Sequence, residues 1–452
     1  MKPVVLVTGI LDTKGAELRY ISEQIRESGC DTLIMELSLG REVGEPWIDI
    51  PLGKVLEVIG KTPEDIYKKS RNDAGELVSQ AGILVAKKLQ LEGRINGIIS
   101  YCGSMGSAIT SAVMRELPYG FPKLLLSTSL HNYENYVQFK DMMVMYPLSE
   151  CGFNVISKKI MSTAAGAIAG AAKMNAGFSN EIDTNKLVPV TMQGVTTPCG
   201  QRAYNIVNSW PGYESMIIHC TGAGGLSIEA MAREKAFAGL LDLNIAELGN
   251  NKLGGKSNSG PGRLVQAAAN GIPQVIGTGS LDFVTFGGGD HDVPQKYMDE
   301  VARKIEGRIY SRHNVNVSII STTVEECREL ARELAEKISC ASAPTAVLIP
   351  LRGSSGYEME SPDIRKGWAG PGAAPCWLPY DGHPHWSKRS VNFMEELCAD
   401  LPGDNGNIKV FACDMHINDP EYADTAAEMI RRMIDGDGDP YELDSAKISE
   451  VF

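Results

Sequence analysis

The sequence lacks long hydrophobic runs, closely paired cysteines and an excess of positive charge, and each absence excludes a class of protein. No run of about 18 consecutive apolar residues occurs, so no ordinary membrane-spanning helix is expected. The ten cysteines are scattered without CxxC spacing, which excludes a disulfide framework and a cysteine-rich zinc site. The net charge of −13 disfavours direct nucleic-acid binding, because phosphate backbones require an excess of lysine and arginine.

Chain length and cellular compartment follow from equally simple observations. The start, Met1-Lys2-Pro3, leads directly into an apolar segment and leaves no room for a secretory signal, so we expect a cytoplasmic protein. The 452 residues exceed one ordinary core, which predicts two or three domains. Hydrophobic residues make up 43% and charged residues 22%, proportions typical of well-packed globular domains.

Short apolar segments alternate with amphipathic segments, which predicts α/β domains whose parallel sheets carry helices on both faces. Strands are expected at 4–7, 32–37, 97–101, 123–127 and 142–146, and again at 188–192, 215–219, 239–243, 274–277, 315–320, 346–350 and 409–413. The polar stretch 177–186 is the best linker candidate. We therefore predict two doubly wound, Rossmann-like domains with mostly parallel sheets, over residues 1–180 and 187–452.

Some segments do not fit this alternation cleanly. Residues 40–74 have little periodicity and are expected to be an insertion. The tract 352–384 is rich in Gly, Pro and Trp and is expected to be a long loop. A helix is expected at 262–269. The motif DGHPHW at 381–386 contains an HxH pair, but its loop-like context favours a packing role over a metal site.

Glycine-containing turns follow three strands of the first domain, and ligands of such sheets bind beyond the carboxyl ends of the strands. The turns read TGILDTKG, YCGSMGSA and STSLHNYENY. Helix N-termini carry partial positive charge and readily hold phosphate, and Lys14 can add a full charge. Taken alone, YCGSMGSA is explained about equally well as a tight turn with a serine cap. TGILDTKG is explained about equally well as a turn in which Asp12 or Thr13 caps the first helix and Lys14 is solvated. The predicted nucleotide-binding residues are Asp12, Thr13, Lys14, Gly103, Ser104, Gly106, Ser107, Ser127 and Thr128.

The loops after the strands of the second domain carry more ionisable side chains. If these strands are parallel, one edge of the sheet gathers His219, Glu229, Asp242, Glu247, Arg263, Asp282, Arg352, His416 and Asp419. We predict His219, His416, Asp282, Arg263 and Arg352 as catalytic residues: histidine exchanges protons near neutral pH, and arginine grips carboxylates. Ordinary explanations compete, since His219 ends an apolar strand and Asp419-Pro420-Glu421 has the pattern of a helix start.

The loops, in this order, resemble the ATP-binding domain family typified by the tomato mosaic virus resistance protein, whose bacterial relatives are largely uncharacterised. The matching stretches extend from residue 6 to about 430 and include LDTKGAE, TMQGVTTPC, HCTGAGGLSIE, GPGRLVQAAANGIPQV, LIPLRGSSG and HINDPEYA. The resemblance implies two α/β domains, ATP bound by the first, and a homodimer. The glycine turns depart from the family pattern, because Met105 stands where glycine would leave more room for phosphate.

Three functions follow as hypotheses. The first is an ATP-dependent enzyme, with Mg²⁺, acting on a small oxygen-rich metabolite between the domains. The second is a nucleotide-independent hydrolase or lyase of a small acid that uses only the second domain. The third is a non-catalytic regulatory protein that binds a protein partner.

Overall fold

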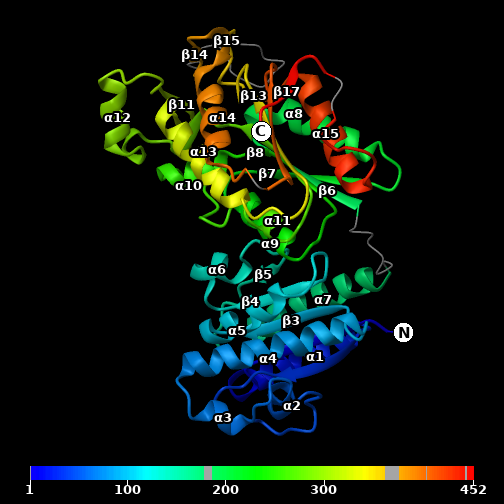
Figure 1. Ribbon diagram of the computed structural model, residues 1–452. Helices are drawn as coiled ribbons and strands as arrows, with labels where there is room; N and C mark the ends of the chain where they lie inside the picture. Colours follow the sequence, from blue (N-terminus) through cyan, green and yellow to red (C-terminus); the bar gives the residue numbers. More distant parts are fainter. Residues whose placement is uncertain (1, 178–185, 362–375, 404, 443–444) are drawn as a thin grey trace. The chain divides into compact units, whose positions relative to one another are not determined.

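The computed structural model describes residues 2–177, 186–361, 376–403, 405–442 and 445–452. The chain divides into two compact units, Met1–Ile182 and Asp183–Phe452, drawn in blue to green and in green to red in Figure 1. Residues 178–185 of the predicted linker and residues 362–375 of the predicted long loop lie outside the described residues. Within the described part of the chain, no helix combines the length and apolar character needed to cross a membrane.

The first unit is an alternating α/β domain with a five-stranded parallel sheet in the order β2-β1-β3-β4-β5. Its elements are β1 Val4–Gly9, α1 Leu11–Glu27, β2 Asp31–Glu36, α2 Leu52–Glu57, α3 Pro63–Tyr67, α4 Arg71–Leu91, β3 Gly97–Cys102, α5 Ser104–Arg115, β4 Lys123–Ser127, α6 Tyr133–Val137, β5 Met143–Met145 and α7 Val155–Gly177.

The strands of this unit are apolar on both faces because both faces are covered. Leu6 and Ile98 pack with α4 and α5, whereas Val5, Val7 and Ile99 pack with α1 and α7. Each face therefore has a core of its own, as the unbroken apolar strands predict.

The second unit repeats this plan around a seven-stranded sheet in the order β17-β16-β13-β9-β8-β6-β7. Its elements are β6 Leu187–Met192, α8 Thr197–Asn208, β7 Glu214–His219, α9 Ala223–Arg233, β8 Leu240–Asn244, α10 Ala246–Leu253, α11 Gln266–Ala269, β9 Gln274–Gly279, β10 Phe283–Gly287, α12 Gln295–Ala302, β11 Tyr310–Asn314, β12 Val317–Ser321, α13 Val324–Ile338, β13 Thr345–Pro350, β14 Pro379–Tyr380, β15 His383–Ser387, α14 Lys388–Asp400, β16 Ile408–Cys413, α15 Pro420–Asp435 and β17 Ile448–Glu450.

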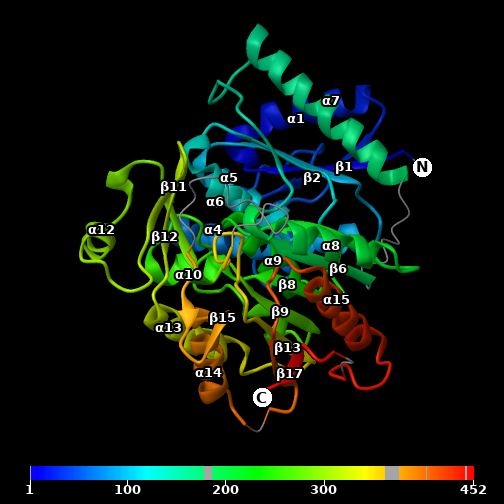
Figure 2. The same cartoon turned by 90° about the horizontal axis from the view of Figure 1, so that it is seen from above.

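Helices cover both faces of this second sheet as well. Figure 2 shows α13 and α14 on one side of β9 and β13, and α8 and α15 on the other. Only β17 runs antiparallel to its neighbour in the sheet. The predicted fold class, two doubly wound α/β domains with mostly parallel sheets, is confirmed.

Both sheets share one strand order, which locates their binding edges. Counted along the chain, the parallel strands lie in the order 2-1-3-4-5 in the first unit, and in the second unit this order continues to a sixth strand. The order reverses between β1 and β3 in the first sheet and between β6 and β8 in the second. Ligands of open α/β sheets bind at such a reversal, beyond the carboxyl ends of the strands.

Four local predictions need correction. The strand predicted at 315–320 forms β12 at 317–321, in a separate antiparallel sheet with β10 and β11. The helix predicted at 262–269 begins only at Gln266, because Leu264 has a left-handed φ of 65°. The insertion 40–74 contains the short helices α2 and α3 and the first turn of α4. The described part of the predicted loop 352–384 contains β14 and the start of β15, which pair as a hairpin.

Candidate functional site

The strand reversal of the first unit places a buried lysine beside an exposed glutamate. Lys14 lies in α1 just after β1, and its backbone leaves the helical conformation at φ −125° and ψ 15°. Its Nζ pairs with Glu150 Oε1 at 3.3 Å and also donates to the Glu150 carbonyl oxygen. The Lys14 side chain is 7% exposed and the Glu150 side chain 65% exposed. A buried cation is thus neutralised by a surface carboxylate.

The two other predicted turns approach the same carboxylate. Thr128, after β4, donates its hydroxyl to Glu150 Oε2 at 2.5 Å. Gly103 caps the start of α5, and a Cβ added there would lie 2.8 Å from Glu150 Oε1. The hydrogen bond from Thr128 and the charge of Lys14 hold the pKa of Glu150 below its usual value. The carboxylate therefore marks a place where an anion is stabilised.

Other predicted residues of this edge are buried beneath the turns and hold them in place. Ser107 and Ser127 are buried and their hydroxyls lie 2.7 Å apart, which ties the α5 turn to the end of β4. Gly106 packs directly on Cys102, where a side chain would not fit. Met105 lies against Gly75 of α4 and joins the apolar core on that face. Its side chain is therefore directed into packing between α4 and α5.

Asp12 and Thr13 lie next to Lys14 in the first turn of α1. Thr13 is exposed, and its hydroxyl donates to the Ile10 carbonyl at 3.2 Å. Asp12 Oδ2 accepts from the Gly40 N–H at 3.0 Å, whereas Asp12 Oδ1 is buried and has no hydrogen-bond partner. A buried carboxylate oxygen without a donor is costly, so this atom is a candidate for contact with a ligand.

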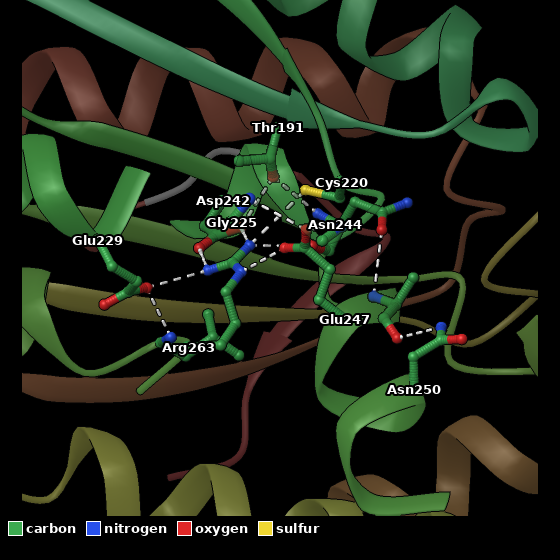
Figure 3. Close-up of polar contacts among 12 residues, drawn as sticks. Thr191, Cys220, Gly225, Glu229, Asp242, Asn244, Glu247, Asn250 and Arg263 are labelled. Atoms are coloured by element: carbon green, nitrogen blue, oxygen red, sulfur yellow. Dashed lines mark hydrogen bonds and ion pairs between the residues drawn. The ribbon is translucent and has the colours of Figure 1, made fainter. Parts of the chain in front are cut away.

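The strand reversal of the second unit is filled by a buried arginine (Figure 3). Arg263 donates to both oxygens of Asp242 at 2.5 and 2.6 Å and to Glu247 Oε2 at 2.7 Å. Weaker contacts of 3.4 Å reach Glu229 Oε1 and the Asn244 carbonyl. These five contacts to oxygen match the five N–H donors of a guanidinium. Arg263 is 0% exposed, so in this structure its donors are already occupied.

Charge pairing sets the pKa values of this Arg263 cluster. Burial alone lowers the pKa of Arg263, but Asp242 and Glu247 outweigh burial and raise it well above its usual value. Burial raises the pKa of Glu229, and Arg263 acts in the opposite direction. Glu229 also accepts the backbone N–H groups of Leu264, Val265 and Gln266, which fixes the loop that carries Arg263. The Arg263 cluster thus joins α9, β8 and α10 to the loop that precedes α11.

Glu247 of the Arg263 cluster also occupies the glycine turn HCTGAGG. Glu247 Oε1 accepts from the N–H groups of Gly222 at 2.6 Å and Gly225 at 3.0 Å, at the start of α9. A Cβ at Gly225 would overlap Glu247 Oε2, so the carboxylate fits only against glycine. Glu247 is 0% exposed. The anion position of this helix is therefore held by an internal carboxylate that solvent does not reach.

Asp282 belongs to a second buried network, with Ser354, Ser355 and Glu358. Ser355 Oγ donates to Asp282 Oδ2 at 2.8 Å. Ser354 Oγ lies 3.0 Å from Asp282 Oδ1 and 2.9 Å from Glu358 Oε2. Glu358 in turn pairs with the buried Arg389 at 3.2 Å. Burial, followed by the charge of Glu358, raises the pKa of Asp282 to about 7.

The two predicted histidines lie at opposite ends of the second sheet. His416 is 2% exposed; its Nε2 lies 2.9 Å from the Ser355 carbonyl and its Nδ1 accepts from the Asn418 N–H at 3.0 Å. These contacts fit a neutral imidazole and link His416 to the Asp282 network. His219 is exposed at the end of β7. Four strands separate β7 from β16, a distance on the order of 24 Å at the usual strand spacing.

The remaining predictions fall on the surface. Arg352 is exposed and grips Asp414 with two hydrogen bonds of 2.7 and 2.9 Å, which lowers the pKa of Asp414. His383 stacks on Trp386, and His385 contacts Glu360 at 2.9 Å. In the described ranges, no group of three or more His, Cys, Asp and Glu side chains is arranged to hold a metal ion. Asp419 is the N-cap residue of α15, as its sequence context predicts, and its Oδ2 accepts the His416 N–H at 2.8 Å.

The sequence analysis missed residues of both units: Glu150 beside Lys14 in the first unit, and Glu358 and Arg389 in the Asp282 network of the second unit. Glu150 follows β5 and thus belongs to the same class of post-strand loops as the turns that we singled out. An acidic residue in that loop, PLSECGF, was the available signal. Glu358 and Arg389 gave no comparable signal, because their partners are distant in the chain.

Comparisons with known proteins cover both units. A model described as "Uncharacterised protein family (UPF0261) N-terminal domain" matches residues 3–177. Its C-terminal counterpart matches residues 185–368. A UPF0261 protein of Clostridium tetani is 36% identical over 369 residues, which cover 80% of this chain and 87% of that protein.

More distant similarity extends along most of the chain. A UPF0261 protein of Mesorhizobium japonicum is 28% identical over 430 residues, covering 94% of this chain and 98% of that protein. The ToMV susceptible protein tm-1(GCR26) of Solanum lycopersicum is 28% identical over 452 residues, covering 95% of this chain and 56% of the tomato protein. Both domains are therefore shared, in the same order, with bacterial and plant proteins.

Proposed function

The chain belongs to the uncharacterised protein family UPF0261, and on this premise we propose that its first unit binds ATP, accompanied by Mg²⁺, at the strand reversal between β1 and β3. The observation that carries the proposal is the buried Lys14 ammonium, whose charge is met by the exposed Glu150 carboxylate at the start of α5. A phosphate group offers the same negative charge and oxygen acceptors to the same donors.

Eight of the nine predicted residues then have a role in the proposed site, and Thr13 is the exception. Lys14 neutralises phosphate charge, and the Ser104 and Thr128 hydroxyls donate to phosphate oxygens. Gly103 allows close approach to the α5 N-terminus, whose first N–H groups have no acceptor within the helix. Asp12 Oδ1, buried without a partner, is the candidate to contact Mg²⁺ or a ribose hydroxyl. Gly106, Ser107 and Ser127 hold the turns in place.

A wider proposal builds on this nucleotide site. The chain acts as an enzyme on a small oxygen-rich metabolite, as a homodimer in the cytoplasm. His219, His416, Asp282, Arg263 and Arg352 stay predicted catalytic residues. The nucleotide-independent hydrolase or lyase and the regulatory binding protein stay alternatives. Burial of His416, Asp282 and Arg263 within saturated networks favours the first unit as the place where a ligand is held.

Calorimetric titration with ATP and Mg²⁺ tests the proposal directly. We expect binding by the wild type and a loss of about 10- to 100-fold in affinity for Lys14→Gln, the usual effect of removing a charged hydrogen-bond donor. Thr128→Val should lose a smaller factor. Lys87→Gln is the matched control, because Lys87 pairs with Glu116 at the same 3.3 Å but lies away from the turns. Absence of heat and of any thermal shift at millimolar ATP would eliminate the nucleotide site.

A further inference from the structure

We propose that Glu150 is a built-in competitor of the ligand: its carboxylate occupies the phosphate position of the first unit until an incoming anion displaces it. This inference rests on the nucleotide-binding function proposed above and adds a regulatory residue to it. No motif of the glycine turns contains Glu150, which comes from the loop after β5.

The geometry of the carboxylate is that of a bound anion. Its two oxygens are shared between a buried ammonium and a hydroxyl, with Lys14 Nζ 3.3 Å from Oε1 and Thr128 Oγ1 2.5 Å from Oε2. The start of α5 lies close behind, at Gly103. These groups come from the turns after β1, β4 and β3, respectively. The Thr128 hydroxyl has one proton to donate and the space in front of Gly103 is taken by Glu150 Oε1, so a ligand anion at this position has to displace the Glu150 carboxylate.

The backbone of the loop that carries Glu150 is anchored, so the Glu150 side chain can move away while the loop stays in place. Tyr101 donates its hydroxyl to the Ser149 carbonyl at 2.6 Å, and the Gly152 N–H donates to Glu17 Oε1 at 2.9 Å. Lys14 also contacts the Glu150 carbonyl, which does not depend on the carboxylate. Because the Glu150 side chain is 65% exposed, its rotation into solvent uncovers little buried surface. Displacement requires a change of side-chain rotamer and no unfolding of the loop.

Competition of this kind selects ligands by charge. With Glu150 in place, the Lys14 ammonium is already paired, so a monoanionic carboxylate gains little by replacing another carboxylate. A phosphate chain carries more charge per group and offers more acceptor oxygens to the same donors. Glu150 thus favours polyphosphate ligands over the abundant carboxylate metabolites, and it keeps the buried ammonium neutralised while the site waits for ligand.

Titration of ATP and Mg²⁺ into three variants tests the proposal. Glu150→Gln should bind ATP about 1.5- to 5-fold more tightly than the wild type, the range expected for losing an exposed ion pair. Glu116→Gln is the matched control and should bind like the wild type, because Glu116 is 51% exposed and also pairs with a lysine at 3.3 Å. Glu150→Asp keeps the charge but shortens the reach to Lys14 and Thr128. It should also bind more tightly than the wild type.

The outcomes separate this inference from the function on which it rests. Equal or weaker binding by Glu150→Gln, alongside binding by the wild type, overturns the competition and leaves the nucleotide site standing. A second outcome is wild-type affinity in Glu150→Asp together with tighter binding by Glu150→Gln. It would show that the negative charge of residue 150 weakens ATP binding from a distance, without its carboxylate occupying the phosphate position. This outcome also overturns the competition. Failure of every variant to bind ATP overturns both proposals.

Discussion

Replacing Asp282 by asparagine should flatten the pH dependence of the stability of the second unit. The Ser354 hydroxyl lies within hydrogen-bond distance of both Asp282 Oδ1 and Glu358 Oε2, at 3.0 and 2.9 Å. One hydroxyl has one proton to donate, so the second contact is a hydrogen bond only if a carboxyl group supplies the other proton. Glu358 pairs with Arg389, which leaves Asp282 as the protonated partner.

The size of the effect follows from the pKa of Asp282. In the fold it rises from the ordinary 3.8 to about 7, so between these values the folded chain holds a proton that the unfolded chain has released. Stability is therefore highest below the unfolded pKa and is lost as pH rises toward the folded pKa. At 1.36 kcal/mol for each pKa unit, the loss between pH 4 and pH 8 is on the order of 4 kcal/mol.

The Asp282→Asn variant would keep the hydrogen bonds of the protonated acid without its titration. The new amide can donate to Ser354 while its oxygen accepts from Ser355, so the variant should match or exceed wild-type stability near pH 8. Its stability should lose the drop of about 4 kcal/mol that Asp282 gives the wild type between pH 4 and pH 8. Asp242→Asn is the contrasting control: it removes a carboxylate from buried Arg263, and we expect a loss of about 3–5 kcal/mol.

Tryptophan fluorescence during urea unfolding reports this unit, because it contains four of the five tryptophans, Trp210, Trp368, Trp377 and Trp386. The midpoint would be measured from pH 4 to pH 8 for the wild type and both variants. Parallel pH profiles of the wild type and Asp282→Asn would refute the argument, because they would show that Asp282 is ionised in the fold over the whole range.

Two further predictions concern the Arg263 cluster and its glycine turn. Arg263→Met leaves three buried carboxylates without a cation and should cost about 3–5 kcal/mol in urea unfolding; Arg263→Lys should not restore the loss, since lysine cannot make the two-pronged contact with Asp242. Gly225→Ala should lower thermal stability by about 2–3 kcal/mol through overlap with Glu247, whereas Gly170→Ala, in open space on α7, should raise it by about 0.5–1 kcal/mol. Equal effects of the two alanines would contradict the packing described for Gly225.

The fold could be predicted from the sequence because both sheets are buried on both faces. Continuous apolar segments such as Lys123–Ser127 then stand out against amphipathic helices, and the predicted bounds of β4 agree with the structure. The antiparallel strand β11 has no such contrast and was missed; β10 was missed too, although its residues FVTFG are mostly apolar and buried. In Tyr310–Asn314 the pattern is mostly polar, because this edge strand is partly exposed.

Which residues come together in a site was harder to predict, because the local sequence pattern does not reveal the order of the strands in the sheet. His219 ends β7 and His416 follows β16, so both belong to the carboxyl edge, yet four strands lie between β7 and β16. Lys14 and Gly103 follow neighbouring strands and do approach the same carboxylate. Topology decides which of the candidate residues meet, and only the three-dimensional pairing of strands supplies it.

Each unit has a carboxylate near the start of a helix that follows a glycine turn, but the consequences differ. At α9 of the second unit, Glu247 accepts two glycine N–H groups and is itself held by Arg263, all at 0% exposure for both side chains. Displacing Glu247 would strand a charge inside the protein, so this turn is closed to ligands. At α5 of the first unit, the Glu150 carboxylate lies near Gly103 and is held from the surface by Lys14 and Thr128, and water can solvate it when it leaves. The Glu150 carboxylate can return to solvent and the Glu247 carboxylate cannot, and this difference supports the proposal that the ligand binds to the first unit.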